Sequence, residues 1–68
     1  MENVVKKYRE RLSFTQEQLA NLTGVSRQSI ISIEKGHYIP TTVLALKISV
    51  VLKVRIEELF ILNDEDWK

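Results

Sequence analysis

Residues 15–36 read TQEQLANLTGVSRQSIISIEKG and carry the start signals of two short helices. Thr15 stands three residues before Gln18, which is the spacing of a capping box. In that arrangement a threonine hydroxyl and an amide side chain satisfy backbone N–H groups that a helix start leaves free. Ser26 has the hydrogen-bonding chemistry of a second N-cap. The stretch therefore predicts that one helix begins after Thr15 and another after Ser26.

Two glycines supply the matching stop signals. Gly24 and Gly36 each follow a helical segment, and the left-handed conformation that often ends a helix is least costly for glycine. The predicted helices are then 16–23 and 27–35, joined by a tight turn. The residues expected on their buried sides are Leu19, Leu22, Ile30 and Ile33.

Three further helices are predicted outside this stretch, because apolar residues recur there at helical spacing. They span residues 2–12, 42–53 and 56–60. Pro40 disfavours helix just before the longest of them, and Thr41 supplies its N-cap. No segment has the partner run or hairpin turn that would predict a sheet. The expected fold is all-α, with five short helices.

The composition is that of a small cytoplasmic domain. With 68 residues and no Cys, the chain is expected to form one domain without disulfides or thiolate metal sites. No apolar run approaches the ~20 residues that would cross a bilayer. The net charge of +1 divides into +3 over residues 1–62 and −2 over residues 63–68. We therefore expect a mildly basic domain, 1–62, and a short acidic tail, 63–68.

Two capped helices around a glycine turn match the helix-turn-helix unit. In that unit the amino-terminal residues of the second helix enter the major groove of DNA. Arg27 and Gln28 occupy these positions. Arginine can bond guanine O6 and N7, and glutamine can bond adenine N6 and N7, each pair giving ~1–3 kcal/mol of discrimination. Elsewhere in a chain, an Arg-Gln pair would most simply be interpreted as two solvent-facing residues. The position of Arg27 and Gln28 directly after this turn favours base contact instead.

The same segment, followed by PTTVLALKI and VRIEELF, resembles the Xre/Cro/phage-repressor (lambda-repressor-like) family of prokaryotic DNA-binding regulators. The resemblance extends over nearly all of residues 4–62. It implies the five-helix lambda-repressor-like fold. It also implies that Arg9 pairs with Glu34 and ties the first helix to the end of the third.

The resemblance further implies a set of DNA contacts. Gln16 would anchor on a phosphate and brace Gln28, while Arg27, Gln28 and Ser32 would face base edges. Ser32 has the alternative of reaching only a phosphate or a water. The residues after the recognition helix would meet the sugar-phosphate chain; they are Lys35, Gly36, His37 and Tyr38.

Ile31 has two interpretations. It lies next to Ile30 and close to the line of Gln28 and Ser32, where relatives usually carry a polar residue. One interpretation is a methyl contact with thymine in the major groove. The other is a partly covered surface isoleucine, which is ordinary when single. The position favours the thymine contact slightly.

Lys53 and Arg55 depart from the family pattern. Lys53 stands where glycine often follows the fourth helix, and a left-handed lysine costs ~1 kcal/mol. Either that turn is reshaped or the helix runs longer. Arg55 replaces a small capping residue, which weakens the start of the helix at 56–60.

Several apolar residues exceed what a small core can absorb, and two arrangements could cover them. Val43 and Val50 share a helix face, and three more apolar residues lie near the carboxyl terminus. One arrangement is a two-fold homodimer, and the other is a tail folded back within one molecule. The dimer hypothesis assigns its interface to Val43, Val50, Ile61, Leu62 and Trp67.

The functional prediction is a sequence-specific regulator that binds double-stranded operator DNA, most simply as a repressor in the cytoplasm and nucleoid. The alternative is an antitoxin-like interaction module whose tail holds a partner protein. No enzyme is predicted, because no converging set of polar residues suggests a catalytic pocket. No cofactor is expected, and the single histidine, His37, gives no multi-histidine metal site.

Overall fold

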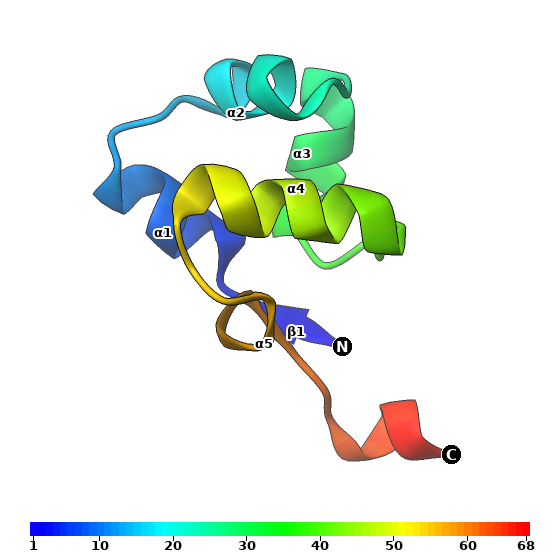
Figure 1. Ribbon diagram of the computed structural model, residues 1–68. Helices are drawn as coiled ribbons and strands as arrows, with labels where there is room; N and C mark the ends of the chain where they lie inside the picture. Colours follow the sequence, from blue (N-terminus) through cyan, green and yellow to red (C-terminus); the bar gives the residue numbers. More distant parts are fainter.

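The computed structural model describes residues 1–68 and contains five α-helices (Figure 1). The helices are α1 (Val5–Arg11), α2 (Gln16–Thr23), α3 (Arg27–Glu34), α4 (Thr42–Leu52) and α5 (Ile56–Leu59). Two short strands, β1 (Glu2–Asn3) and β2 (Phe60–Ile61), and a 3-10 helix, η1 (Asp64–Trp67), complete the chain. In Figure 1, α4 crosses the molecule with α2 on one side and α5 with the carboxyl-terminal tail on the other. None of the helices has the length and hydrophobicity that a membrane span requires.

The start of α2 is held by the capping box that the sequence predicts. The Thr15 hydroxyl accepts a hydrogen bond from the Gln18 backbone N–H at 3.0 Å, and the Gln18 side-chain oxygen accepts one from the Thr15 N–H at 2.8 Å. Gly24 ends the helix in the left-handed conformation with φ 76°. The chain can therefore reverse without a strained side chain, and both boundaries of α2 are confirmed.

The start of α3 is also as predicted, and its end comes one residue earlier. The Ser26 hydroxyl accepts a hydrogen bond from the Ser29 N–H at 3.1 Å. The helix ends at Glu34 rather than Lys35, and Gly36 follows with φ 77°. The His37 N–H donates to the Ser32 carbonyl at 2.9 Å. This bond holds the following loop against the last turn of α3.

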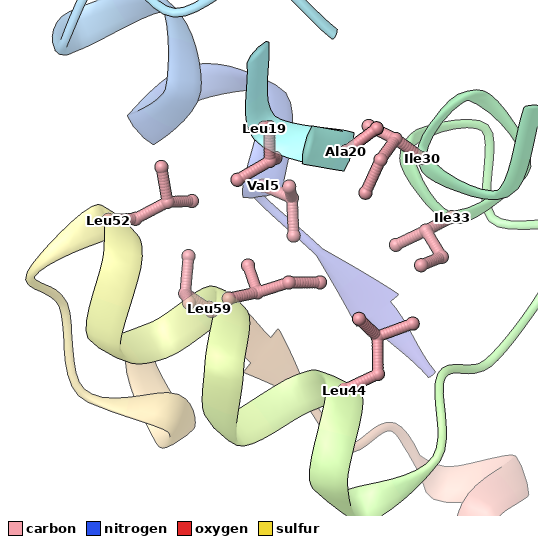
Figure 2. Close-up of a cluster of buried hydrophobic side chains, with 9 residues drawn as sticks. Val5, Leu19, Ala20, Ile30, Ile33, Leu44, Leu52 and Leu59 are labelled. Carbon is pink, nitrogen blue, oxygen red and sulfur yellow. The ribbon is translucent and has the colours of Figure 1, made fainter. Parts of the chain in front are cut away.

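The core is formed by nine buried apolar residues from α1 to α5. Figure 2 shows side chains from α2, α3 and α4 converging on the space between the helices. The nine residues are Val5, Leu19, Ala20, Ile30, Ile33, Leu44, Ile48, Leu52 and Leu59. Each helix is short and contributes few of them, so most of its stability must come from this packing rather than from its own propensity.

Leu22 was expected on the buried side of α2, and this prediction is wrong. It is 56% exposed, whereas Leu19 is fully buried. Thr23 occupies the inner position instead, because its hydroxyl donates to the Leu19 carbonyl at 2.8 Å and leaves no unpaired polar group inside. The face of α2 that meets the core is therefore Leu19, Ala20 and Thr23, and Leu22 lies at its edge.

The two-stranded sheet corrects the prediction that no sheet forms. β1 and β2 pair antiparallel, with Glu2 opposite Ile61 and Asn3 opposite Phe60. As a consequence α1 begins at Val5 rather than residue 2, and α5 ends before Phe60. Strands of two residues from opposite ends of the chain have no local pattern that a sequence window could detect.

Asn3 connects this sheet to α3. Its side-chain oxygen accepts a hydrogen bond from the Val5 N–H at 3.2 Å, close to the start of α1. Its side-chain nitrogen donates to the Ile33 carbonyl at 2.9 Å. The sheet is therefore fixed directly to the last turn of α3.

Lys53 adopts the conformation in which glycine would be least strained. α4 ends at Leu52, and Lys53 has φ 58° and ψ 40°. Both alternatives, a reshaped turn and a longer helix, are therefore wrong, because the chain makes the usual left-handed turn with a lysine. Arg55 precedes α5 without any side-chain capping bond, as predicted.

The acidic tail forms its own small turn. The Asn63 side chain accepts a hydrogen bond from the Asp66 N–H at 3.3 Å, and the Asp66 carboxylate accepts one from the Asn63 N–H at 2.9 Å. The second bond is the main reason why the pKa of Asp66 lies below its usual value. Asp66 also pairs with the Met1 ammonium at 3.1 Å. The tail thus has a defined conformation beside β1.

Lys53→Gly should raise the free energy of unfolding by about 0.5–1 kcal/mol, because it removes the left-handed strain at φ 58°. Urea denaturation measures this change. Lys47→Gly is the matched control, since it places glycine inside α4 and should lower the same free energy by about 1 kcal/mol. A loss of stability in Lys53→Gly would show that the turn carries no such strain.

Candidate nucleic-acid interface

The first turn of α3 presents Arg27 and Gln28 to solvent. Ser26 caps the helix, so these two side chains are its first and second residues. Both are exposed, while Ile30 and Ile33 on the other side of the helix are fully buried. The core thus orients α3, and the orientation directs its two amino-terminal polar side chains away from the protein.

Gln28, Ser32 and Tyr38 come together around one shallow hollow. Its volume is about 330 Å³, and its lining is polar except for the tyrosine ring. The bond from His37 to the Ser32 carbonyl places Tyr38 across from the helix. Ser26 and Ser29 also line this hollow, with their hydroxyls 3.0 Å apart. Ser29 was not predicted as a contact residue, because the hollow that it lines with Tyr38 forms only when the loop after α3 folds back.

A second polar hollow, of about 610 Å³, lies beside the first turns of α2 and α3. It contains three cationic side chains and no apolar residue. Its lining is Lys6, Arg9, Thr15, Gln16, Glu17 and Arg27. The predicted phosphate anchor Gln16 and the predicted base reader Arg27 therefore lie at the same surface. Lys6 was missed, since in the sequence it is one of several charged residues on the solvent side of a helix.

A buried ion pair holds this surface together. The Arg9 Nε donates to Glu34 Oε2 at 2.6 Å, and its Nη2 donates to Oε1 at 3.3 Å. Arg9 Nη1 donates to the Phe14 carbonyl at 2.7 Å. Only 9% of the Arg9 side chain and 4% of the Glu34 side chain are exposed. The pairing that the family resemblance implies is thus present, and it joins α1, the loop before α2, and the end of α3.

Gln16 belongs to this network. Its side-chain nitrogen donates to Glu34 Oε1 at 3.1 Å, and no hydrogen bond joins it to Gln28. The expected brace between Gln16 and Gln28 is therefore wrong for the protein without DNA. A carboxylate accepts a stronger hydrogen bond than a neutral amide, which explains the preference for Glu34.

The remaining predicted DNA contacts are Ile31 within α3 and residues 35–38 directly after it. Lys35, Gly36 and His37 are exposed, and Tyr38 is 42% exposed. Ile31 is partly buried, a position compatible with both of its interpretations.

The five residues of the predicted dimer interface are all exposed, in two separate places. Val43 and Val50 are 64% and 76% exposed on α4, in a groove that α4 forms with α2. The others are 41% exposed at Ile61, 56% at Leu62 and 77% at Trp67. The tail does not cover Val43 or Val50 in this structure.

Comparison with known proteins agrees with this geometry. The family model described as Helix-turn-helix matches residues 5–59, from the first helix to the end of α5. The chain belongs to the helix-turn-helix family of DNA-binding transcription regulators. This family consists of DNA-binding regulators and is not a family of enzymes.

Related regulators align over almost the whole chain. An uncharacterized HTH-type transcriptional regulator of Methanocaldococcus jannaschii is 50% identical over 66 residues, covering 97% of this chain and 100% of the relative. The uncharacterized HTH-type transcriptional regulator YgzD of Bacillus subtilis is 42% identical with the same coverage. The restriction-modification controller protein C.AhdI of Aeromonas hydrophila has a similar structure, with a TM-score of 0.76 and 30% identity. That match covers 82% of this chain and 85% of C.AhdI.

Glu34→Ala should lower the free energy of unfolding by about 3–5 kcal/mol, because it leaves the Arg9 guanidinium buried without its partner. Chemical denaturation measures the loss. Glu57→Ala is the control: Glu57 pairs with Arg55 at 3.4 Å, but both side chains are largely exposed, so the change should stay below about 1 kcal/mol. Equal losses in the two variants would contradict a special role for the buried pair.

Proposed function

We propose that this helix-turn-helix regulator binds a specific double-stranded operator and represses transcription by occupying it. The observation that supports the proposal is the exposure of Arg27 and Gln28 at the start of a helix whose opposite side is fully buried. Such a helix can enter the major groove so that the residues of its first turn contact the base edges. The protein would act in the cytoplasm, at the nucleoid.

The proposed base contacts follow from the chemistry of the α3 surface. Arg27 would bond guanine through O6 and N7, and Gln28 would bond adenine through N6 and N7. Ser32 lines the same hollow as Gln28 and would contact a neighbouring base or a bridging water. Ile31 would add an apolar contact to a thymine methyl. These contacts would carry the sequence preference.

The proposed phosphate contacts flank the reading turn on both sides. Gln16 lies on one side with Lys6, in the hollow that it shares with Arg27. Lys35, His37 and Tyr38 are exposed directly after α3. Cationic side chains at phosphates release counterions, so they give affinity without sequence preference. The two flanks would fix the angle at which α3 enters the groove.

A two-fold dimer would place two recognition helices on one operator. One recognition helix contacts few base pairs, whereas two helices can read half-sites about 34 Å apart. The exposed apolar residues Val43, Val50, Ile61, Leu62 and Trp67 are the proposed interface. Their exposure supports association, because large apolar groups in water favour contact with another surface.

Selection of binding sites from random duplexes tests the base-reading assignment. The wild-type protein should enrich a two-fold symmetric sequence, and Gln28→Ala should lose preference at one base position of each half-site, at a cost of ~1–3 kcal/mol for the preferred base. Quantitative gel shifts on the selected site and on its single-base variants measure this cost. An unchanged consensus in Gln28→Ala would refute the role of Gln28.

Lys35→Ala should weaken binding to all duplexes to a similar extent, because a phosphate contact carries no base information. The slope of log Kobs against log salt should fall by about one. Fluorescence anisotropy at several salt concentrations measures this slope. Lys7→Ala is the matched control, since Lys7 is exposed on α1 and lines neither polar hollow. A selective loss at one sequence would instead make Lys35 a base reader.

A further inference from the structure

An apolar groove lies between the last turn of α2 and the length of α4. Its volume is about 640 Å³, the largest of the three hollows on the molecule. Leu22, Val43, Leu46 and Val50 line it and are 49% to 76% exposed. The groove contains one charged residue, Lys47. It shares no residue with the two polar hollows assigned to DNA.

The carboxyl-terminal tail carries the opposite charge and its own exposed apolar side chains. Leu62 and Trp67 are 56% and 77% exposed. The residues between them include three consecutive acids, 64–66. The reciprocal bonds of Asn63 and Asp66 hold this segment in a fixed turn. The indole of Trp67 therefore projects from an ordered element.

The groove and the tail do not meet within one molecule. The groove lies on the side of α4 that faces α2, and Figure 1 shows the tail on the other side of α4. The tail is also held by the pairing of β2 with β1. One chain thus presents a groove and a segment of complementary character, and each lacks an occupant within that chain.

We infer that the tail of one molecule occupies the α2–α4 groove of a second copy. The Trp67 indole enters between Val43, Leu46 and Val50, and the acids before it lie near Lys47. The second copy does the same in return, so a two-fold axis closes the assembly as a dimer. This inference rests on the dimer proposed above and states how its two surfaces meet: the tail of each molecule contacts the groove of the other.

The size of the contact approaches that of a specific dimer interface. A tryptophan buries ~150–250 Å². Two reciprocal tails, together with the groove walls that receive them, therefore approach the ~1,000 Å² that a specific interface needs. Buried aromatic anchors also contribute a large share of the binding energy at interfaces. The first turn of α3 remains free for DNA, since neither the groove nor the tail includes it.

Trp67 is the only tryptophan, so its fluorescence reports directly on this contact. In the full chain without DNA, its emission should shift to the blue and lose accessibility to iodide as concentration rises. Sedimentation equilibrium on the same samples should show dimer forming over the same range. A monomer with unshifted emission at all micromolar concentrations would overturn the inference.

Two variants separate the tail from the groove. Trp67→Ala removes the occupant, and Val50→Asp places a charge in the groove at a residue that is 76% exposed and tolerates it in the monomer. Each should weaken self-association at least about tenfold. Ile39→Asp is the matched control, because Ile39 is 60% exposed but lines no part of the groove, and it should associate normally. Circular dichroism verifies that all three variants fold.

Mixing the two defective variants provides the decisive measurement. Val50→Asp keeps an intact tail and Trp67→Ala keeps an intact groove, so one contact can form in the mixture. Since Trp67→Ala has no tryptophan, titrating it into Val50→Asp should shift the emission of the single indole to the blue and yield a heterodimer. No shift on mixing, or a dimer that persists in Trp67→Ala and is lost in Val50→Asp, would overturn the inference and indicate packing of α4 against α4.

DNA binding is scored separately on a duplex with one half-site. Trp67→Ala should keep the base preference of the wild-type protein there. If the preference is absent while the mixture still associates, the proposed DNA reading fails alone. If the preference remains while the mixture stays monomeric, the tail-to-groove contact fails alone.

Discussion

The buried ion pair of Arg9 and Glu34 fixes the geometry of the proposed DNA-binding surface. Removing two charges from water is costly, and the cost is offset only when their hydrogen-bonding groups find good partners. Here the guanidinium bonds both carboxylate oxygens and the Phe14 carbonyl, and Gln16 adds a further donor to the carboxylate. Because these residues come from α1, the start of α2 and the end of α3, one network sets how the two helices of the reading unit are placed.

The apolar core determines which side of each helix faces outward. α3 buries Ile30 and Ile33 completely, so its polar face has one possible orientation. The loop after α3 is bonded back to Ser32, and Asn3 reaches the Ile33 carbonyl from the small sheet. α3 is thus held at its beginning by a cap and at its end by contacts from two distant segments. A rigid reading helix loses less conformational entropy when it binds DNA.

The molecule divides its surface by polarity. The two hollows beside the first turns of α2 and α3 are lined almost entirely by polar residues, and the groove of α2 and α4 is mainly apolar. A chain of 68 residues has too small an interior to bury every apolar side chain. Six of the ten exposed large apolar side chains lie on α4 or in residues 61–67, outside the two polar hollows.

Local signals in the sequence were sufficient to predict where α2 and α3 begin and which residues form the first turn of α3. The capping box at Thr15, the cap at Ser26 and the glycine after each helix act through bonds and dihedral angles within a few residues, so they can be read directly from the chain. Long-range contacts were not accessible in this way. Four features depend on which distant segments meet. They are the pairing of β1 with β2, the exposure of Leu22, the hydrogen bond of Gln16 to Glu34 instead of Gln28, and the separation of Val43 from Trp67. These long-range contacts are determined by how all the helices pack around the core, and a short window of sequence does not contain that information.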